Sequence, residues 1–164
     1  MITLVLGGAR SGKSLVAEQR AACLAPPVTY VATAGVDEDD ADHVARVDAH
    51  RARRDASWRT IEAGADLAAV LRAVTGSVLV DSLGTWVTAD ARLDPDVDAL
   101  VDALRERSGD AILVSEEVGL GVHPSSEAGR RFRDVLGTIN RSMAEIADDV
   151  LLVVAGRVLP LERP

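Results

Sequence analysis

Short apolar runs alternate along the chain with longer segments whose apolar residues recur every three or four positions. The runs are continuous rather than alternating, which is typical of strands that are covered on both faces of a sheet. They predict five strands and a short edge strand, at Ile2–Leu6, Val28–Ala32, Ser77–Asp81, Ala111–Ser115, Val150–Val154 and Arg157–Leu159.

The segments between these runs have the period of helices. The longest shows it best, because Phe132, Leu136, Ile139 and Met143 all lie on one helical face. The predicted helices are Ser14–Leu24, Asp39–Arg54, Ala65–Val74, Pro95–Arg107 and Glu127–Ala147, and the predicted mobile loops are Ala34–Asp42 and Glu117–Ser126. Repeated strand–helix units predict an α/β fold with a largely parallel central sheet flanked by helices.

Composition narrows the class of protein. The 164 residues, 48% of them hydrophobic, fit a single domain over residues 1–164. A net charge of −8 argues against a general binder of nucleic acid or anionic membranes. The single cysteine, Cys23, rules out an internal disulfide, and with three histidines it cannot complete a structural zinc cluster. With no targeting segment and no apolar run of about 20 residues, a cytoplasmic protein without a membrane span is expected.

The strongest motif follows the first predicted strand. It fits the phosphate-loop pattern G-x-x-x-x-G-K-[ST] and opens the first predicted helix. Its glycines let backbone N–H groups wrap a phosphate. Lys13, the only lysine, is expected to bridge the β- and γ-phosphates, and Ser14 to occupy one Mg²⁺ position. The predicted nucleotide-binding residues of this loop are Gly7, Gly8, Ala9, Arg10, Ser11, Gly12, Lys13 and Ser14.

A carboxylate is expected beside this loop, at the end of a neighbouring strand. Asp81 ends the predicted strand Ser77–Asp81 and is the candidate that would hold Mg²⁺ with Ser14, directly or through water. Glu116 and Glu117 are competing candidates, and a solvated strand end is the plain alternative for each. The chain has no Asn-Lys-x-Asp motif, which disfavours a guanine-reading GTPase switch, and no basic, aromatic-rich surface for single-stranded nucleic acid.

A second group of candidate catalytic residues lies between Asp48 and Thr60, where the sequence has His50 and four arginines. A neutral imidazole is a good nucleophile toward phosphorus, and adjacent cations stabilise the charge that forms. A solvated basic helix end with an ordinary surface histidine is the alternative. The spacing alone leaves both interpretations open.

Several blocks together make the sequence recognisable. They are Leu6–Ser14, Tyr30–Ala34, His50–Arg54 with Trp58–Glu62, Leu79–Leu83 with Trp86–Thr88, Glu117–Gly121, and Arg130–Asp134 followed by Asn140. With these blocks the chain resembles the bifunctional adenosylcobinamide kinase / adenosylcobinamide-phosphate guanylyltransferase family of cobalamin biosynthesis over essentially its whole length.

This resemblance implies two reactions. The aminopropanol hydroxyl of adenosylcobinamide is phosphorylated, and GMP then passes from GTP to that phosphate, giving adenosylcobinamide-GDP and pyrophosphate. The second reaction runs through a GMP–histidine intermediate, so His50 and Lys13 are the expected catalytic residues. The resemblance also implies Mg²⁺, GTP and ATP as ligands, a RecA-like P-loop fold and a homotrimer. Beyond the phosphate loop, the implied nucleotide contacts are Ala32, Thr33, Ala34, Arg51, Ala52, Arg53, Arg54, Glu62 and Asp81.

The chain departs from the family pattern at a few positions. Ser115-Glu116 replaces a common Thr-Asn pair, Ser82 and Gly84 replace residues that are often Cys and Leu, and His123 replaces an aliphatic residue. These changes bear on substrate detail and on the efficiency of the kinase step. Two other functions stay open beside the one that the resemblance implies. A kinase of another small hydroxyl substrate predicts no protein–GMP species, and a nucleotide-dependent regulatory module predicts no corrinoid-dependent turnover.

Overall fold

The structure, a computed structural model, describes residues 1–33 and 55–163. The predicted helix Asp39–Arg54 and the predicted loop Ala34–Asp42 lie outside the described residues. The described strands are β1 (Ile2–Gly7), β2 (Val28–Ala32), β3 (Arg59–Glu62), β4 (Ser77–Asp81), β5 (Ala111–Glu116), β6 (Asp149–Val154) and β7 (Arg157–Pro160). The described helices are α1 (Lys13–Ala21), α3 (Leu67–Ala73), α4 (Leu83–Ala89), α5 (Val97–Glu106) and α6 (Glu127–Ile146).

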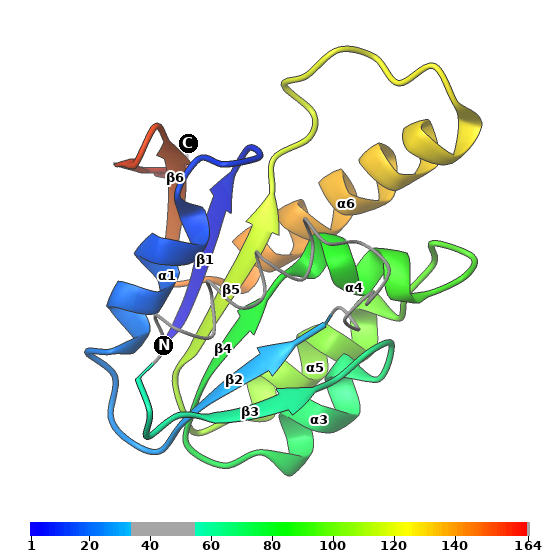
Figure 1. Cartoon of the computed structure of the whole chain (residues 1–164). Coiled ribbons are helices and arrows are strands. Elements are labelled where there is room, and N and C mark those ends of the chain that lie inside the picture. Colours follow the sequence, from blue (N-terminus) through cyan, green and yellow to red (C-terminus); the bar gives the residue numbers. More distant parts are fainter. Residues whose placement is uncertain (34–54, 164) are drawn as a thin grey trace.

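The strands form one sheet in the order β3-β2-β4-β5-β1-β6-β7. All neighbouring pairs are parallel except β6 and β7, which are antiparallel. As Figure 1 shows, α1 covers one face of the sheet, while α3, α4, α5 and α6 lie on the other. The predicted α/β architecture with a largely parallel sheet and helices on both faces is confirmed.

The central strands are buried on both sides. Along β1, Leu4 packs into the core under α3–α6, whereas its neighbour Val5 packs into the core under α1. Val78 and Leu79 of β4 divide in the same way, since successive strand residues point to opposite faces. This two-sided burial explains why the strands read as continuous apolar runs. No helix in residues 1–33 or 55–163 is long and apolar enough to cross a membrane.

The sequence patterns do not predict two of the described elements, β3 and α4, and each case has a physical reason. Edge strand β3 reads Arg-Thr-Ile-Glu and is largely exposed, so it shows no apolar run. It begins after a turn in which Asp55 accepts hydrogen bonds from the backbone N–H and the hydroxyl of Ser57, which lower the pKa of Asp55. Helix α4 has only seven residues, and a reciprocal cap between Ser82 and Thr85 starts it.

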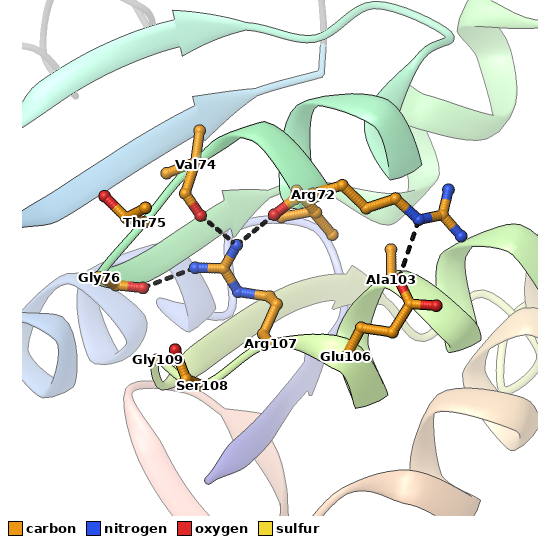
Figure 2. Close-up of a pocket in the computed structure, with 10 residues that line it drawn as sticks. Arg72, Val74, Thr75, Gly76, Ala103, Glu106, Arg107, Ser108 and Gly109 are labelled. Atoms are coloured by element: carbon orange, nitrogen blue, oxygen red, sulfur yellow. Dashed lines mark hydrogen bonds and ion pairs between the residues drawn. The ribbon is translucent and has the colours of Figure 1, made fainter.

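Arg107, the residue after α5, binds the C-terminal end of α3 and the segment that leads into β4 (Figure 2). Its guanidinium donates hydrogen bonds to the backbone oxygens of Leu71, Val74 and Gly76. Burial lowers the pKa of Arg107 below its ordinary value. Arg107 lines a cavity of about 290 Å³. Its guanidinium is already hydrogen-bonded to backbone carbonyls, so the role of Arg107 there is structural.

Replacing Arg107 with methionine is expected to lower the free energy of unfolding by about 2 kcal/mol, because three backbone carbonyls lose a charged donor. Urea denaturation measures the change. Arg72→Met is the matched control, since Arg72 pairs with Glu106 at the surface and its loss costs about 0.5 kcal/mol or less. Equal destabilisation by the two variants would contradict the assigned role of Arg107.

Candidate nucleotide site

The phosphate loop joins β1 to α1 and needs glycine at two positions. A Cβ on Gly7 would lie 2.4 Å from Ser11 Oγ and 2.8 Å from the carbonyl oxygen of Val153. Gly12, the residue before α1, has a φ of 94°, which L side chains rarely adopt. The backbone N–H of Gly156, in the β6–β7 turn, donates to the carbonyl of Ser11 at 2.8 Å. The turn between β6 and β7 therefore holds the phosphate loop in place through this hydrogen bond.

Lys13 is the first residue of α1 and folds back over the loop. Its Nζ lies 3.5 Å from the carbonyl oxygen of Gly8 and 3.4 Å from Oε1 of Glu116. The lysine side chain is only 12% exposed. Its ammonium group thus stands at the carboxyl ends of β1 and β5, where a phosphate-loop lysine meets its phosphates.

Asp81 ends β4, one strand beyond β5 from the loop. Its Oδ1 accepts a hydrogen bond from Ser14 Oγ at 3.5 Å, and its Oδ2 accepts one from the Tyr30 hydroxyl at 3.1 Å. The two residues predicted as metal ligands, Ser14 and Asp81, are therefore brought together by the fold.

The two competing glutamates differ in where their carboxylates lie. The Oε2 of Glu116 accepts hydrogen bonds from Ser82 Oγ and the Gly84 N–H, both at 3.1 Å, while its Oε1 lies 3.4 Å from Lys13 Nζ at the phosphate loop. Glu117 lies just after β5, and its Oε1 accepts a hydrogen bond from the backbone N–H of Gly119, two residues further along the chain, at 2.7 Å. Of the two, Glu116 is the one whose carboxylate contacts Lys13.

The other predicted contacts lie farther along the same edge of the sheet. Thr33, just after β2, is fully buried, and its hydroxyl donates to the carbonyl of Ser82 at 2.6 Å. Ala32 ends β2 and pairs in register with Glu62, which ends β3 and is exposed. Thr33 thus supports the Asp81–Ser82 segment. Six predicted residues lie outside the described part of the chain: Ala34, His50, Arg51, Ala52, Arg53 and Arg54.

Sequence reasoning assigned no role to several residues that hold this site in place. Buried Asn140, on α6, donates from Nδ2 to the carbonyl of Glu116 at 3.0 Å, and its Oδ1 lies 2.5 Å from Ser115 Oγ. Ser82 and Gly84 hold the Glu116 carboxylate from the start of α4. One local signal was available, since Ser82 and Thr85 have the spacing of a helix cap.

The comparisons with known proteins agree on one assignment. The family model of cobinamide kinase / cobinamide phosphate guanyltransferase matches residues 3–161. The chain belongs to this family. It is 43% identical over 171 residues to the bifunctional adenosylcobalamin biosynthesis protein CobP of Pseudomonas aeruginosa, with 99% of this chain and 98% of that protein covered. It is 33% identical over 178 residues to CobU of Salmonella typhimurium, with 95% and 97% covered.

A solved structure supports the fold. The chain superposes with a TM-score of 0.58, at 14% identity, on a prototypical ATPase from the type III secretion system of pathogenic bacteria. The match covers 92% of this chain and 51% of that chain, so this chain spans about half the length of the ATPase. The predicted P-loop NTPase fold is confirmed, as is the predicted enzyme class of kinase and guanylyltransferase in cobalamin biosynthesis.

Proposed function

We propose that this chain phosphorylates the aminopropanol hydroxyl of adenosylcobinamide and then transfers GMP from GTP to the phosphate it has made. The products of the second reaction are adenosylcobinamide-GDP and pyrophosphate. The observation that carries the proposal is the gathering of Lys13, Asp81 and Glu116 around one phosphate loop, in a chain of this family. ATP and GTP are the nucleotide substrates.

Nucleotide binding rests on the loop Gly7–Ser14. Its backbone N–H groups and the N-terminus of α1 face the phosphates, and Lys13 neutralises the group that leaves. In phosphorylation Lys13 stabilises charge on the nucleoside diphosphate. In GMP transfer the same ammonium group stabilises the departing pyrophosphate, so one loop serves both reactions. The other proposed nucleotide contacts are Ala32, Thr33, Ala34, Arg51, Ala52, Arg53, Arg54, Glu62 and Asp81.

Mg²⁺ fits the oxygen donors beside the loop. Ser14 Oγ and Asp81 Oδ1 lie 3.5 Å apart and offer a hydroxyl and a carboxylate, the donors that Mg²⁺ prefers. Within residues 1–33 and 55–163, no group of three or more acidic, His or Cys side chains gathers into a cage. Two protein oxygens completed by phosphates are the usual arrangement for this ion. When bound, Mg²⁺ supplies charge neutralisation on the phosphates.

His50 is the proposed carrier of GMP. Its imidazole attacks the α-phosphorus of GTP, the bond to the β-phosphate oxygen breaks, and pyrophosphate leaves. The phosphate of the corrinoid then attacks the same phosphorus and releases His50. Arg51, Arg53 and Arg54 supply positive charge next to this histidine. The support for this step is the sequence block and the family, since His50 lies outside the described residues.

A single catalytic domain, a homotrimer and a cytoplasmic location are further parts of the proposal. The two apolar cores lie on opposite faces of one sheet, which supports a single domain over residues 1–164. Val154, Val158 and Leu159 are exposed at the β6–β7 edge, an apolar surface of the kind that subunit contacts cover.

Turnover of the corrinoid tests the proposed function. The chain is incubated with adenosylcobinamide, MgCl₂ and ATP, then with GTP, and the corrinoids are separated by chromatography. Adenosylcobinamide phosphate is expected first, and adenosylcobinamide-GDP with released pyrophosphate after GTP is added. Phosphorylation without the second product would restrict the chain to a kinase, and the absence of both products would refute the proposal.

A further inference from the structure

Glu116, the last residue of β5, holds one carboxylate oxygen in a fixed place and directs the other at the phosphate loop. Two donors, Ser82 Oγ and the Gly84 N–H, bind Oε2 at 3.1 Å each. Oε1 lies 3.4 Å from Lys13 Nζ. Because Oε2 has two donors from α4 and its cap and Oε1 faces Lys13, both oxygens of the carboxylate have partners before any ligand binds.

The backbone beneath this carboxylate is equally well fixed. The carbonyl of Glu116 accepts a hydrogen bond from Asn140 on α6, and the register of β5 places Glu116 opposite Gly7 of β1. Asn140 is itself held by Ser115 inside the core. A group mounted on the end of a buried central strand keeps its position relative to the phosphate loop better than a group on an exposed loop.

The space around Glu116 is shaped for its carboxylate. A Cβ on Gly84 would lie 2.1 Å from Oε2 and 2.9 Å from Cδ of Glu116. Any side chain at position 84 would therefore displace the carboxylate from its two donors. Glycine at this position of α4 and glutamate at the end of β5 are sterically matched.

The carboxylates of Asp81 and Glu116, both at this edge of the sheet, contact different residues of the phosphate loop. Asp81 contacts Ser14, the residue on the Mg²⁺ side, whereas Glu116 contacts Lys13, the residue that meets the β- and γ-phosphates. An oxygen beside the lysine ammonium stands next to the position of the γ-phosphate, where the acceptor hydroxyl must arrive.

We propose that Glu116 is the general base of the phosphorylation step. The oxygen of the acceptor hydroxyl attacks the γ-phosphorus, and its proton moves to Oε1 of Glu116. The bond from the γ-phosphorus to the bridging oxygen breaks, and its electron pair leaves with the nucleoside diphosphate. Glu116 then returns the proton to solvent. This inference rests on the kinase half of the proposed function.

The same base has no task in GMP transfer. The acceptor in that reaction is a phosphate oxygen, which is already largely ionised at neutral pH because the second pKa of a phosphate monoester is about 6. Of the two reactions run at one phosphate loop, only the one with a hydroxyl acceptor depends on Glu116. This difference separates a base from a residue that merely orients Lys13, which both reactions need.

The test measures the two reactions separately in Glu116→Gln, which keeps an oxygen for Ser82 and Gly84 but cannot accept the proton. Phosphorylation of adenosylcobinamide is expected to fall about 10²-fold or more in kcat. GMP transfer to separately prepared adenosylcobinamide phosphate is expected to fall by about 3-fold or less. Glu106→Gln is the matched control, because that carboxylate is exposed and pairs with Arg72 at the far end of the sheet.

A second variant moves the carboxylate without removing it. Gly84→Ala is expected to lower phosphorylation about 10-fold or more and to spare GMP transfer, since its Cβ displaces Glu116. Gly137→Ala, on the exposed side of α6 with nothing within 4 Å of an added Cβ, is the glycine control and is expected to leave both reactions intact.

Equal losses of both reactions in Glu116→Gln, or unchanged phosphorylation, would overturn this inference and leave the proposed function standing. A wild-type chain that phosphorylates no adenosylcobinamide would refute the proposed function and the base together. Loss of phosphorylation alone, in Glu116→Gln and again in Gly84→Ala, is the supporting result.

Discussion

Replacing Lys13 with alanine is expected to lower both phosphorylation of adenosylcobinamide and transfer of GMP by about 10³-fold. Lys13 is the only lysine of the chain and lies over the phosphate loop, 3.5 Å from the carbonyl of Gly8. Each reaction expels a phosphate-bearing group into that loop. Removing one ammonium therefore removes the stabilisation of the leaving group in both reactions at once.

The two rates are measured separately, at saturating nucleotide, with thermal unfolding as a check that the variant is folded. Arg20→Ala is the matched control, because Arg20 is an exposed cation in the last turn of the same helix. The control is expected to keep both rates within about 2-fold, as surface substitutions usually do. A Lys13→Ala chain that keeps more than a tenth of either rate would contradict the shared role of the loop.

Replacing His50 with alanine is expected to have the opposite selectivity to Glu116→Gln. GMP transfer should fall by several orders of magnitude, because the nucleophile is gone, while phosphorylation continues. The measurement is the ratio of adenosylcobinamide-GDP to adenosylcobinamide phosphate formed from the same amount of enzyme.

His43→Ala supplies the control for this variant, since it removes an imidazole seven residues earlier in the chain. It is expected to give the wild-type ratio of products. If His50→Ala also gave the wild-type ratio, His50 would not be the carrier of GMP, and direct attack of the corrinoid phosphate on GTP would replace the two-step route.

The sequence predicted the central strands and helix α6 well, because their buried residues form regular apolar patterns. Strands β1, β2, β4, β5 and β6 are apolar on both faces, and helix α6 carries a regular apolar stripe. The polar edge strand β3 is defined only by pairing with β2, which a local pattern does not contain. Helix α4 is stabilised by a cap at Ser82 and by the burial of Leu83, Trp86 and Val87.

The candidate site also has a part that the sequence predicted and a part that it could not. The phosphate loop is local in sequence, so its motif could be read directly, and Asp81 could be placed because it ends an apolar strand. The choice between Glu116 and Glu117 could not be made, since β5 ends between the two residues and the local pattern does not show which carboxylate faces the loop. The hydrogen bonds from Ser82 and Gly84 that fix Glu116 join residues 34 and 32 positions apart, beyond the reach of any motif.

The most direct test of the two-step transfer follows the phosphorus atoms of GTP. The chain is incubated with GTP labelled with ³²P at the α or at the γ position, denatured, and digested into peptides. The α label is expected on the peptide that contains His50, stable in base, labile in acid, and lost when adenosylcobinamide phosphate is added before denaturation. The γ label should not be retained there. Equal α labelling of the His50→Ala chain would contradict the transfer of GMP through this histidine.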